Sequence, residues 1–412
     1  MKARRRFRPV LRPRADRRLP ADLLPGKVGW LAGTLSQGLR DPGIDQAPVL
    51  PGNWVEVFFS GTEAFALMCA AMESAERDIL VESYICRDDS TGESFLRHLA
   101  DAAARGVAVK VLADAWGSFG TRSRFWAEMR RRGIDVRLFH PLFPSLWYQP
   151  FRDHRKILVV DRKVAFTGGM NIADEYGSAH SALGKGPWRD THARVEGPAA
   201  WEMAVVFSEG WQRAGGTPVE HSPLEPPGSG GASILVLDSR PGRGHTESAS
   251  VLAAIVGAAK RSLWITNAYF APPKGALAIL GDAARRGVDL RLLLPGQSDV
   301  PIVRHAGHGY FDDLLRLGVR IFEYRDAILH AKSLVADEYV SVVGSTNFDF
   351  RSFRFNGECN LVILDEGTGR MLARAFEADL ERSVEVLPET RQRVPTWHRF
   401  GDSLARALSP VL

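Results

Sequence analysis

The sequence predicts an α/β protein made of two similar domains, because one order of elements and one motif both occur twice. The chain has 412 residues, of which 45% are hydrophobic. A chain of this length and composition can bury two ordinary hydrophobic cores. In both halves, apolar strand segments alternate with helical segments, which is typical of a central sheet covered by helices.

The predicted elements follow in the same order in each half. An apolar strand ending near an aromatic residue comes first, then a helix that stops at glycine and enters a second strand, then another helix stop and a third strand. The first half places these segments at residues 78–84, 99–107, 110–112 and 131–136. The second half places them at residues 262–269, 280–288, 291–293 and 316–321. This equivalence predicts a duplicated domain.

Composition marks the domain boundaries. Residues 215–231 are rich in Pro, Gly and Ser and are predicted to be a linker. The expected divisions are a basic N-terminal arm and lead-in, a first domain, this linker, a second domain and a basic amphipathic tail, at residues 1–48, 49–214, 215–231, 232–390 and 391–412. Residues 2–18 hold nine Lys or Arg, which predicts a disordered arm.

A short motif occurs once in each half with the same spacing. It consists of a His, a Lys two residues later, an Asp seven residues later and an Asn seventeen residues later. The two copies are His154, Lys156, Asp161 and Asn171, and His330, Lys332, Asp337 and Asn347. Two such matches in one chain are far beyond chance.

The residue types of the motif indicate chemistry on phosphate groups. Both copies are predicted to lie on strands, so the two-residue gap places His and Lys on the same face. The glycine-rich stretch before each Asn lets backbone approach a ligand, and the Asn adds a neutral donor. Two imidazoles, two ammonium groups and two amides suit a phosphodiester with its attacking and leaving oxygens.

The paired motifs resemble those of the phospholipase D superfamily, and their flanks resemble bacterial cardiolipin synthases. The resemblance covers roughly residues 50–412, and the flanks that carry it are residues 153–176, 188–198, 329–332 and 344–353. It implies two homologous phospholipase D-like α-β-α sandwich domains, packed with the active site at their interface. It also implies a two-step transfer through a phosphohistidine, without a cofactor.

The resemblance further implies a role for each residue. His154 is expected to be the nucleophile and His330 the general acid and base, although the residues alone leave the two interchangeable. The remaining cationic and amide groups are expected to stabilise charge on the non-bridging oxygens of the phosphate; they are Lys156, Lys332, Asn171 and Asn347.

The carboxylates divide into two groups. Asp161 and Asp337 belong to the catalytic set by motif membership, but an odd spacing on a straight strand should turn them away from the site, into a structural turn. Glu358 stands where the superfamily often carries the carboxylate that orients a histidine. Asp190 takes the same place in the first half if residues 177–184 are an insertion, and otherwise is a loop residue or helix cap.

Three other features have weaker interpretations. His305 and His308 could bind a metal, but we prefer an ordinary helix because no carboxylate or Cys lies at ligand spacing, and no metal is expected. Tyr84 and Tyr269 end equivalent strands and could line the cleft. The apolar loop 141–150 either meets acyl chains or packs between the domains.

Composition favours an anionic partner. The net charge is +5, the isoelectric point is about 9.2, and 44 of the 53 basic residues are Arg. Three cysteines without metal or disulfide spacing indicate a reducing compartment. No signal peptide and no run of 18 apolar residues is found, which predicts a peripheral protein on the cytoplasmic side of the cell membrane.

The resulting hypothesis is a phosphatidyltransferase that moves a phosphatidyl group to phosphatidylglycerol and releases glycerol. A phospholipase D hydrolase and a superfamily nuclease are the alternatives, because the same residues serve all three. The expected partners are phospholipids and an anionic membrane surface. Neither nucleic acid nor an obligate protein partner is expected.

Overall fold

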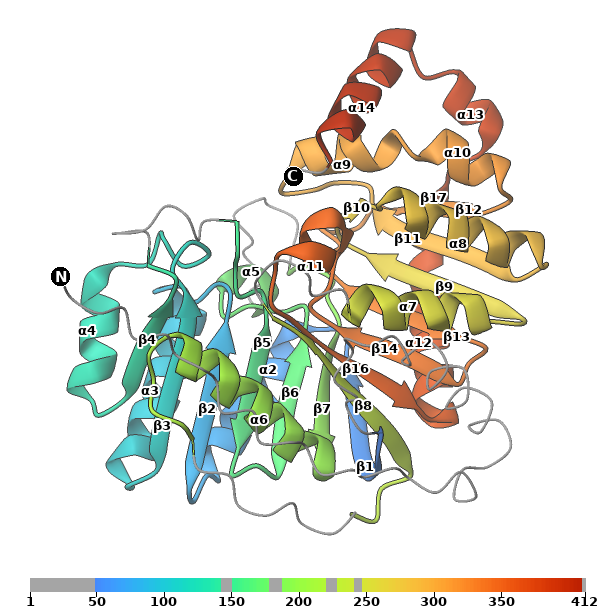
Figure 1. The fold of residues 1–412 in the computed structure, drawn as a ribbon. Coiled ribbons are helices and arrows are strands. Elements are labelled where there is room, and N and C mark those ends of the chain that lie inside the picture. The colour runs from blue at the N-terminus through green and yellow to red at the C-terminus, as the bar shows by residue number, and fades with distance from the viewer. Residues whose placement is uncertain (1–48, 142–149, 178–186, 220–227, 241–246, 410–412) are drawn as a thin grey trace, which may run out of the picture.

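The structure of the chain is a computed structural model that describes residues 49–141, 150–177, 187–219, 228–240 and 247–409. The first half alternates strands and helices (Figure 1). Its elements are β1 (Val49–Phe58), α2 (Gly61–Glu73), β2 (Asp78–Ser83), α3 (Ser90–Ala104), β3 (Ala108–Asp114), α4 (Ser123–Arg131), β4 (Asp135–Phe139), β5 (Lys156–Val160), β6 (Val164–Gly168), α5 (Asp174–Gly177), β7 (His192–Glu196) and α6 (Pro198–Arg213).

The second half repeats this order with additions. Its elements are β8 (Ala232–Ser239), α7 (Glu247–Ala258), β9 (Ser262–Asn267), β10 (Phe270–Ala271), α8 (Lys274–Arg285), β11 (Asp289–Pro295), α9 (Pro301–His308), α10 (Phe311–Arg316), β12 (Arg320–Tyr324), β13 (Lys332–Ala336), β14 (Val340–Gly344), β15 (Phe348–Asp349), α11 (Phe350–Arg354), β16 (Glu358–Leu364), α12 (Glu366–Leu380), β17 (Ser383–Glu385), α13 (Pro388–Gln392) and α14 (Thr396–Leu408).

The larger sheet runs through both halves of the described chain. Its strand order is β17-β12-β11-β9-β13-β14-β16-β8-β1-β7-β6-β5-β2-β3-β4. Apart from β17, the order reads equivalently from either edge toward the centre, where β1 and β8 pair antiparallel. The fold class is therefore α/β with a duplicated domain, as the sequence predicts.

Buried apolar clusters hold the helices against the sheet. One cluster joins α2, α3 and α4 to the strands of the first half, and another joins α7, α8 and α10 to those of the second. A further cluster contains side chains of α6, α12 and strands of both halves. The two halves thus share hydrophobic core, which removes apolar surface from water at their junction.

Equivalent glycines end equivalent helices. Gly106 follows α3 with φ +92°, and Gly287 follows α8 with φ +84°. Glycine enters this left-handed conformation without the steric cost of a Cβ atom, so the chain can leave the helix and start the next strand. The helix stops predicted from the sequence are confirmed at both positions.

The motif aspartates lie in turns at the far ends of the motif strands. Asp161, after β5, accepts backbone hydrogen bonds from Glu76, Arg77 and Asp78 at 2.9, 2.7 and 3.0 Å. Asp337, after β13, does the same for three equivalent N–H groups, those of Lys260, Arg261 and Ser262, at 3.0, 2.7 and 2.9 Å. Each carboxylate therefore ties a hairpin turn to the start of a neighbouring strand.

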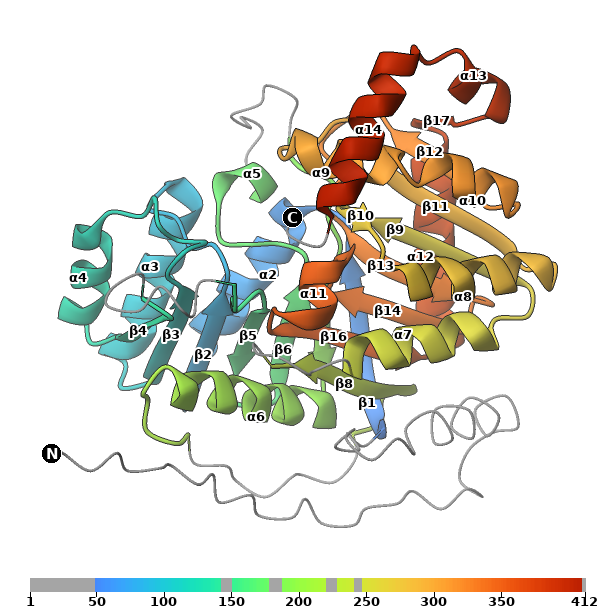
Figure 2. The same ribbon diagram turned by 45° about the horizontal axis from the view of Figure 1, so that its top comes forward.

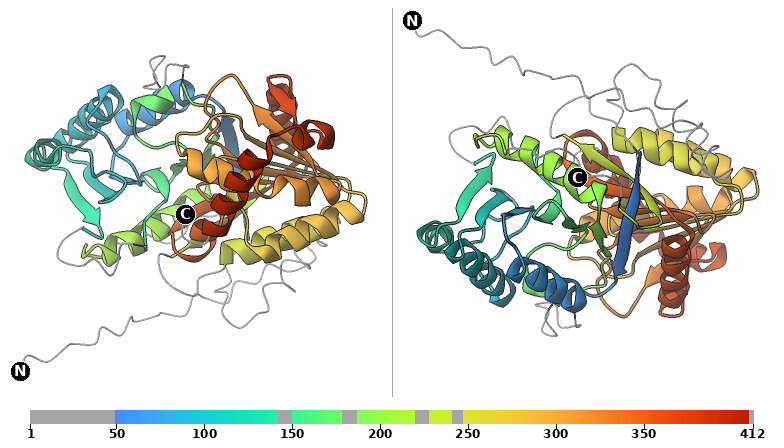
Figure 3. Two further views of the ribbon diagram at one scale, coloured as in Figure 1. Left: turned by 90° about the horizontal axis from the view of Figure 1, so that it is seen from above. Right: turned by 90° about the horizontal axis from the view of Figure 1, so that it is seen from below.

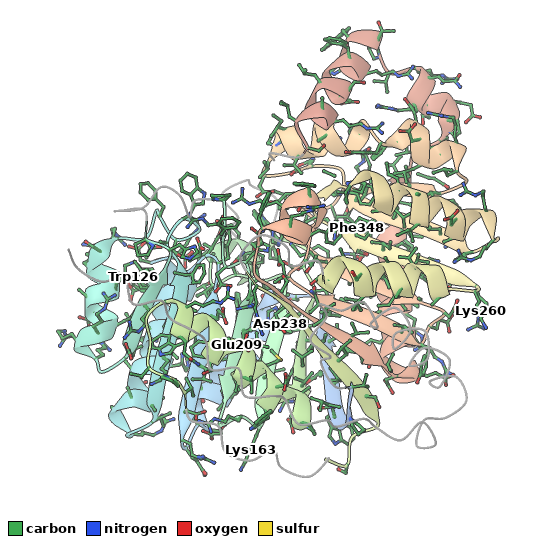
Figure 4. All side chains as sticks on the ribbon, in the orientation of Figure 1. Trp126, Lys163, Glu209, Asp238, Lys260 and Phe348 are labelled. Carbon is green, nitrogen blue, oxygen red and sulfur yellow. The ribbon has the colours of Figure 1, made fainter. Side chains whose placement is uncertain are left out.

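Figure 4 shows how far apart the two ends of these strands lie. Lys163, two residues beyond Asp161, and Lys260, a partner of Asp337, are at the outer ends of the two halves. Phe348, next to the motif Asn347, lies nearer the junction of the halves. The odd spacing of the aspartates thus corresponds to turns at the far ends of the motif strands, as the strand geometry predicts, and their membership of the catalytic set stays a prediction.

The C-terminal helices pack on the second half. Figure 2 shows α14 lying across α9, with α13 beyond it. In the views of Figures 1 and 3, the C-terminal end of α14 reaches toward the junction between the halves. Among the helices that the structure describes, none combines the length and apolarity required to cross a bilayer.

The turn carboxylates should matter for stability and little for chemistry. Asp161→Ala or Asp337→Ala leaves three backbone N–H groups without their acceptor and should lower the free energy of unfolding by about 1–3 kcal/mol. Urea unfolding followed by circular dichroism measures this, and Asp→Asn, which keeps one oxygen acceptor, should lose less. Unchanged stability combined with lost activity would instead place the aspartates in the chemistry.

Candidate active site

The two motif histidines are held by backbone from the opposite half. His154, just before β5, donates its N–H to Gly357 O at 2.8 Å, and His330, just before β13, donates its N–H to Arg189 O at 2.8 Å. Isolated bridges pair Asp153 with Gly357 and Arg189 with Leu329. Since each histidine depends on a segment of the other half, the site exists only where the halves meet.

The side-chain contacts of the two histidines also run from one half to the other. Nδ1 of His154 lies 3.0 Å from Oε2 of Glu358, and Nδ1 of His330 lies 2.7 Å from Oδ2 of Asp190. Both carboxylates are fully buried. A carboxylate only accepts, so Nδ1 of each ring carries the proton and donates, which leaves Nε2 as the atom that can attack or exchange a proton.

Neighbouring groups fix the two carboxylates differently. Ser345 Oγ donates to Oε2 of Glu358 at 2.5 Å, and Asn356 Nδ2 donates to its Oε1 at 3.3 Å. Asp190 accepts the N–H of Thr191 at 2.7 Å on Oδ1. Burial opposes ionisation of Asp190, but nearby Lys332 and His330 hold its pKa below the ordinary value.

The two lysines stand beside the histidines. Lys156 Nζ donates to His154 O at 2.7 Å, and Lys332 Nζ lies 2.8 Å from Nδ1 and 3.1 Å from Nε2 of His330. Burial lowers the pKa of Lys156 to about 7 and that of Lys332 to about 8, although acidic neighbours oppose the shift. A bound phosphate diester would restore their charge, because its negative oxygens favour the ammonium form.

Burial makes both histidines weaker bases than a free imidazole. Burial is the main cause that lowers the pKa of His154 to about 4, and Glu358 opposes it. Burial also lowers the pKa of His330, with a further contribution from Lys332, and Asp190 opposes it. Both rings are therefore neutral near pH 7 in the empty site, and His154 holds a proton less readily than a free imidazole does.

Aromatic rings pack against both histidine–lysine pairs. The ring centroids of Tyr84 and His154 are 4.9 Å apart, and those of Tyr269 and His330 are 5.8 Å apart. Lys156 Nζ lies 5.4 Å from the centroid of Tyr84, and the equivalent Lys332 distance to Tyr269 is 5.9 Å. The two tyrosines border the site symmetrically, as their equivalent sequence positions suggested.

The two asparagines occupy different surroundings. Asn171 Oδ1 accepts the N–H of Ile85 at 3.2 Å, and its Nδ2 donates to Tyr176 Oη at 2.7 Å. Asn347 is buried, and its Oδ1 has no hydrogen-bond partner within the described residues. A buried amide oxygen without a donor carries a desolvation cost that a nearby N–H or O–H group would remove.

Sequence reasoning assigned no role to several residues of the site. Tyr176 Oη lies 3.4 Å from Nδ1 of His330, and the ring of Trp188 is centred 5.3 Å from that of His330. Ser345 and Asn356 hold Glu358, as described above. Tyr176, Trp188 and Ser345 fall inside the flanks that carried the resemblance, so their signal was present without a stated function.

The His305–His308 pair is part of the C-terminal helix packing. Both residues lie on α9, and together with Asp402 their ligand atoms are within 4.8 Å of one another. His305 Nδ1 contacts Asp402 Oδ1 at 2.9 Å, and Arg391 occupies the other oxygen at 2.9 Å. The sequence shows no carboxylate at ligand spacing from the two histidines, but in the fold α14 brings Asp402 next to them. Arg391 neutralises the charge of Asp402, so these contacts are better explained as ones that hold α14 against α9 than as a metal site.

The predicted loop 141–150 and the arm 1–48 cannot be placed in this site. Residues 142–149 and 1–48 lie outside the described part of the chain, as do residues 178–184 of the proposed insertion. The described residues include all eight motif residues, the two orienting carboxylates and the two tyrosines. Contacts connect the histidines with the lysines, the orienting carboxylates and the tyrosines, and Tyr176 connects Asn171 to His330. Asn347 is buried at the end of its motif loop, and Asp161 and Asp337 lie in turns at the far ends of the motif strands.

Comparison with known proteins agrees with this geometry. A family model described as "Cardiolipin synthase, PLD-like domain" matches residues 68–179 and 252–381. The cardiolipin synthase of Geobacillus kaustophilus (strain HTA426) is 36% identical over 381 residues, which are 90% of this chain and 74% of that protein. Cardiolipin synthase 1 of Bacillus anthracis is 32% identical over 382 residues, with 89% of this chain and 74% of that protein covered.

A solved structure shares the fold. The crystal structure of phosphatidylserine synthase from Haemophilus influenzae Rd KW20 matches with a TM-score of 0.69 at 15% identity, and the match covers 93% of this chain and 100% of that one. At this identity the likeness concerns the arrangement of the two halves. Taken with the family model and the curated relatives, it leads to one conclusion: the chain belongs to the cardiolipin synthase family of proteins with phospholipase D-like domains.

Proposed function

We propose that this protein transfers a phosphatidyl group to phosphatidylglycerol through a phosphohistidine and releases glycerol. The observation that carries the proposal is the crossed pair of carboxylate–imidazole contacts, His154–Glu358 and His330–Asp190. They provide two imidazoles of the same tautomer at one site, as a double displacement requires. Family membership supports phospholipids as substrates.

In the first step, Nε2 of His154 attacks phosphorus and the bond to the leaving glycerol oxygen breaks. His330 enters this step as the imidazolium ion, which Asp190 and the negative charge of the bound phosphate diester favour, and it delivers its Nε2 proton to that oxygen. Glu358, 3.0 Å from Nδ1 of His154, stabilises the positive charge that the ring gains when its Nε2 is phosphorylated. Lys156 and Lys332 stabilise the non-bridging oxygens as negative charge gathers on them.

In the second step, His330 removes the proton from the hydroxyl of the acceptor phosphatidylglycerol. The acceptor oxygen then attacks phosphorus, and the Nε2–phosphorus bond of His154 breaks. His330 ends the cycle protonated and His154 neutral. The proton is placed on His330 because Asp190, whose pKa is held below its ordinary value, keeps a negative charge beside that ring.

The activity can be tested on vesicles. Purified protein with phosphatidylglycerol vesicles should form cardiolipin and glycerol in equal amounts, measured by mass spectrometry of lipids and an enzymatic glycerol assay. Phosphatidic acid with glycerol would identify a hydrolase instead. Cleavage of single-stranded DNA with no change in lipid would identify a nuclease.

We further propose that the protein acts at the cytoplasmic face of the cell membrane, where a reducing compartment suits its free cysteines.

The roles of the two histidines can be separated with an activated substrate. A phosphatidyl ester of p-nitrophenol has a leaving group that needs little protonation, so His330→Ala should still release a burst of about one p-nitrophenolate per enzyme and then stall. His154→Ala should release no burst. Stopped-flow absorbance measures the burst, and a burst from His154→Ala alone would reverse the assignment.

The carboxylates should act through their histidines. With the p-nitrophenyl substrate, Glu358→Gln should slow the burst by about 10²–10⁴-fold, while Asp190→Asn should spare the burst and slow the later turnover. Glu128→Gln, a change at an exposed carboxylate on α4, is the matched control. Equal effects of Glu358→Gln and Asp190→Asn on the burst would contradict the crossed assignment.

The lysines should set the alkaline side of the pH profile. A lysine is charged below its pKa, so kcat/KM should fall as pH rises through about 7 and about 8, the values for Lys156 and Lys332. In Lys332→Arg the guanidinium stays charged, so any remaining activity should lose this part of the decline. A wild-type profile that stays flat across this interval would show that both lysines keep their charge.

A further inference from the structure

Helix α14 carries an exposed apolar stripe. Trp397, Phe400, Leu404 and Leu408 are spaced by three, four and four residues and therefore lie on one face of the helix. All four side chains are exposed, with Trp397 at 68% and Phe400 at 71% of their full accessibility. A row of large apolar side chains in water has an unfavourable hydration free energy unless another surface covers it.

The opposite face of α14 is polar and makes the contacts with the protein. Asp402 contacts His305 and Arg391, Arg399 Nη2 lies 3.0 Å from Asp312 Oδ2, and Arg406 Nη1 lies 2.7 Å from Asp313 Oδ2. The helix is therefore inverted relative to an ordinary surface helix, which buries its apolar face. Its polar contacts hold the apolar stripe outward.

Two equivalent loops carry exposed apolar side chains as well. The loop after β3 exposes Trp116 and Phe119, the latter at 74%, and the segment after β11 exposes Val300 at its end and Ile302 in the first turn of α9. β3 and β11 occupy equivalent positions in the two halves of the sheet. Exposed apolar side chains on both copies of one loop indicate a surface with contributions from both halves.

Both loops adjoin the candidate active site. Asp114 accepts the N–H of Trp116 on one oxygen and the N–H of Asp153, the neighbour of His154, on the other, both at 2.9 Å. In the second half, Asp299 accepts the hydroxyl of Tyr269 at 2.7 Å and directly precedes Val300. The exposed apolar side chains thus flank the two histidine–tyrosine pairs from opposite sides.

We propose that the α14 stripe and the two loops form one docking surface for a phospholipid bilayer, with the candidate active site between them. The inference rests on the proposed function, in which both substrates are lipids whose acyl chains stay in the bilayer. Figure 3 shows α14 reaching from the second half toward the junction. Trp, Phe and Leu on a helix face are the side chains that insert at the headgroup–acyl boundary.

Charge indicates how this surface binds. Arg399 and Arg406 of α14 are committed to Asp312 and Asp313, so the helix offers the membrane apolar contacts rather than free cations. Attraction between exposed charges is screened within about 3 Å at 1 M salt, whereas apolar contacts persist. Docking through the stripe therefore persists at high salt, in contrast to binding by the basic segment 2–18.

The test compares two double variants of the full chain. Phe400→Ser/Leu404→Ser removes the middle of the stripe, and Met371→Ser/Val384→Ser changes two exposed apolar side chains on α12 and β17. In 1 M salt, sedimentation with vesicles of phosphatidylcholine and phosphatidylglycerol should be at least about tenfold weaker for the first variant and unchanged for the second. Equal sedimentation of both variants and wild type overturns the proposal.

Two further measurements separate the possible failures. With short-chain phosphatidylglycerol below its critical micelle concentration, Phe400→Ser/Leu404→Ser should keep the wild-type kcat, because the stripe does not touch the histidines. If wild type turns over neither vesicles nor short-chain lipid but still shows the binding difference, the proposed function fails and the docking surface stands.

A wild-type dimer in light scattering that Phe400→Ser/Leu404→Ser converts to monomer would show that a second copy covers the stripe, and would overturn the proposal.

Discussion

The contact on which the site depends is the one between each buried imidazole and a carboxylate from the opposite half. A buried carboxylate needs donors or positive charge near it, and a buried histidine needs its tautomer set. The pairs His154–Glu358 and His330–Asp190 meet both needs at once. Because each pair spans the junction, separating the halves would expose four polar groups whose partners lie on the other side.

This crossing explains why the duplication is useful. One domain contains a histidine, a lysine and a carboxylate, but its carboxylate contacts the histidine of the other domain. Two copies related about the central β1–β8 pair complete each other, and the shared core with α6 and α12 keeps them in register. Apolar burial therefore supplies the rigidity that a preorganised charge arrangement requires.

The two halves are equivalent in backbone but not in chemistry. Glu358 is held by Ser345 and Asn356, whereas Asp190 stands beside Lys332 and His330, which lower its pKa. Tyr176 and Trp188 pack only around His330 among the contacts described. An approximately symmetric fold thereby places the two imidazoles in different surroundings, and a double displacement assigns them different roles as nucleophile and acid.

The sequence by itself determined the fold class, the duplication and the motif residues, while the resemblance to the phospholipase D superfamily singled out Glu358 and, as one alternative, Asp190. Period, spacing and residue type carry that information because they are local properties of the chain. Which carboxylate meets which histidine was decided by tertiary structure, since Glu358 and His154 are 204 residues apart in sequence. The same is true of Asp402 beside His305 and of the outward stripe on α14. These depend on how two domains and a terminal helix dock, and docking is governed by surface complementarity that no local pattern records.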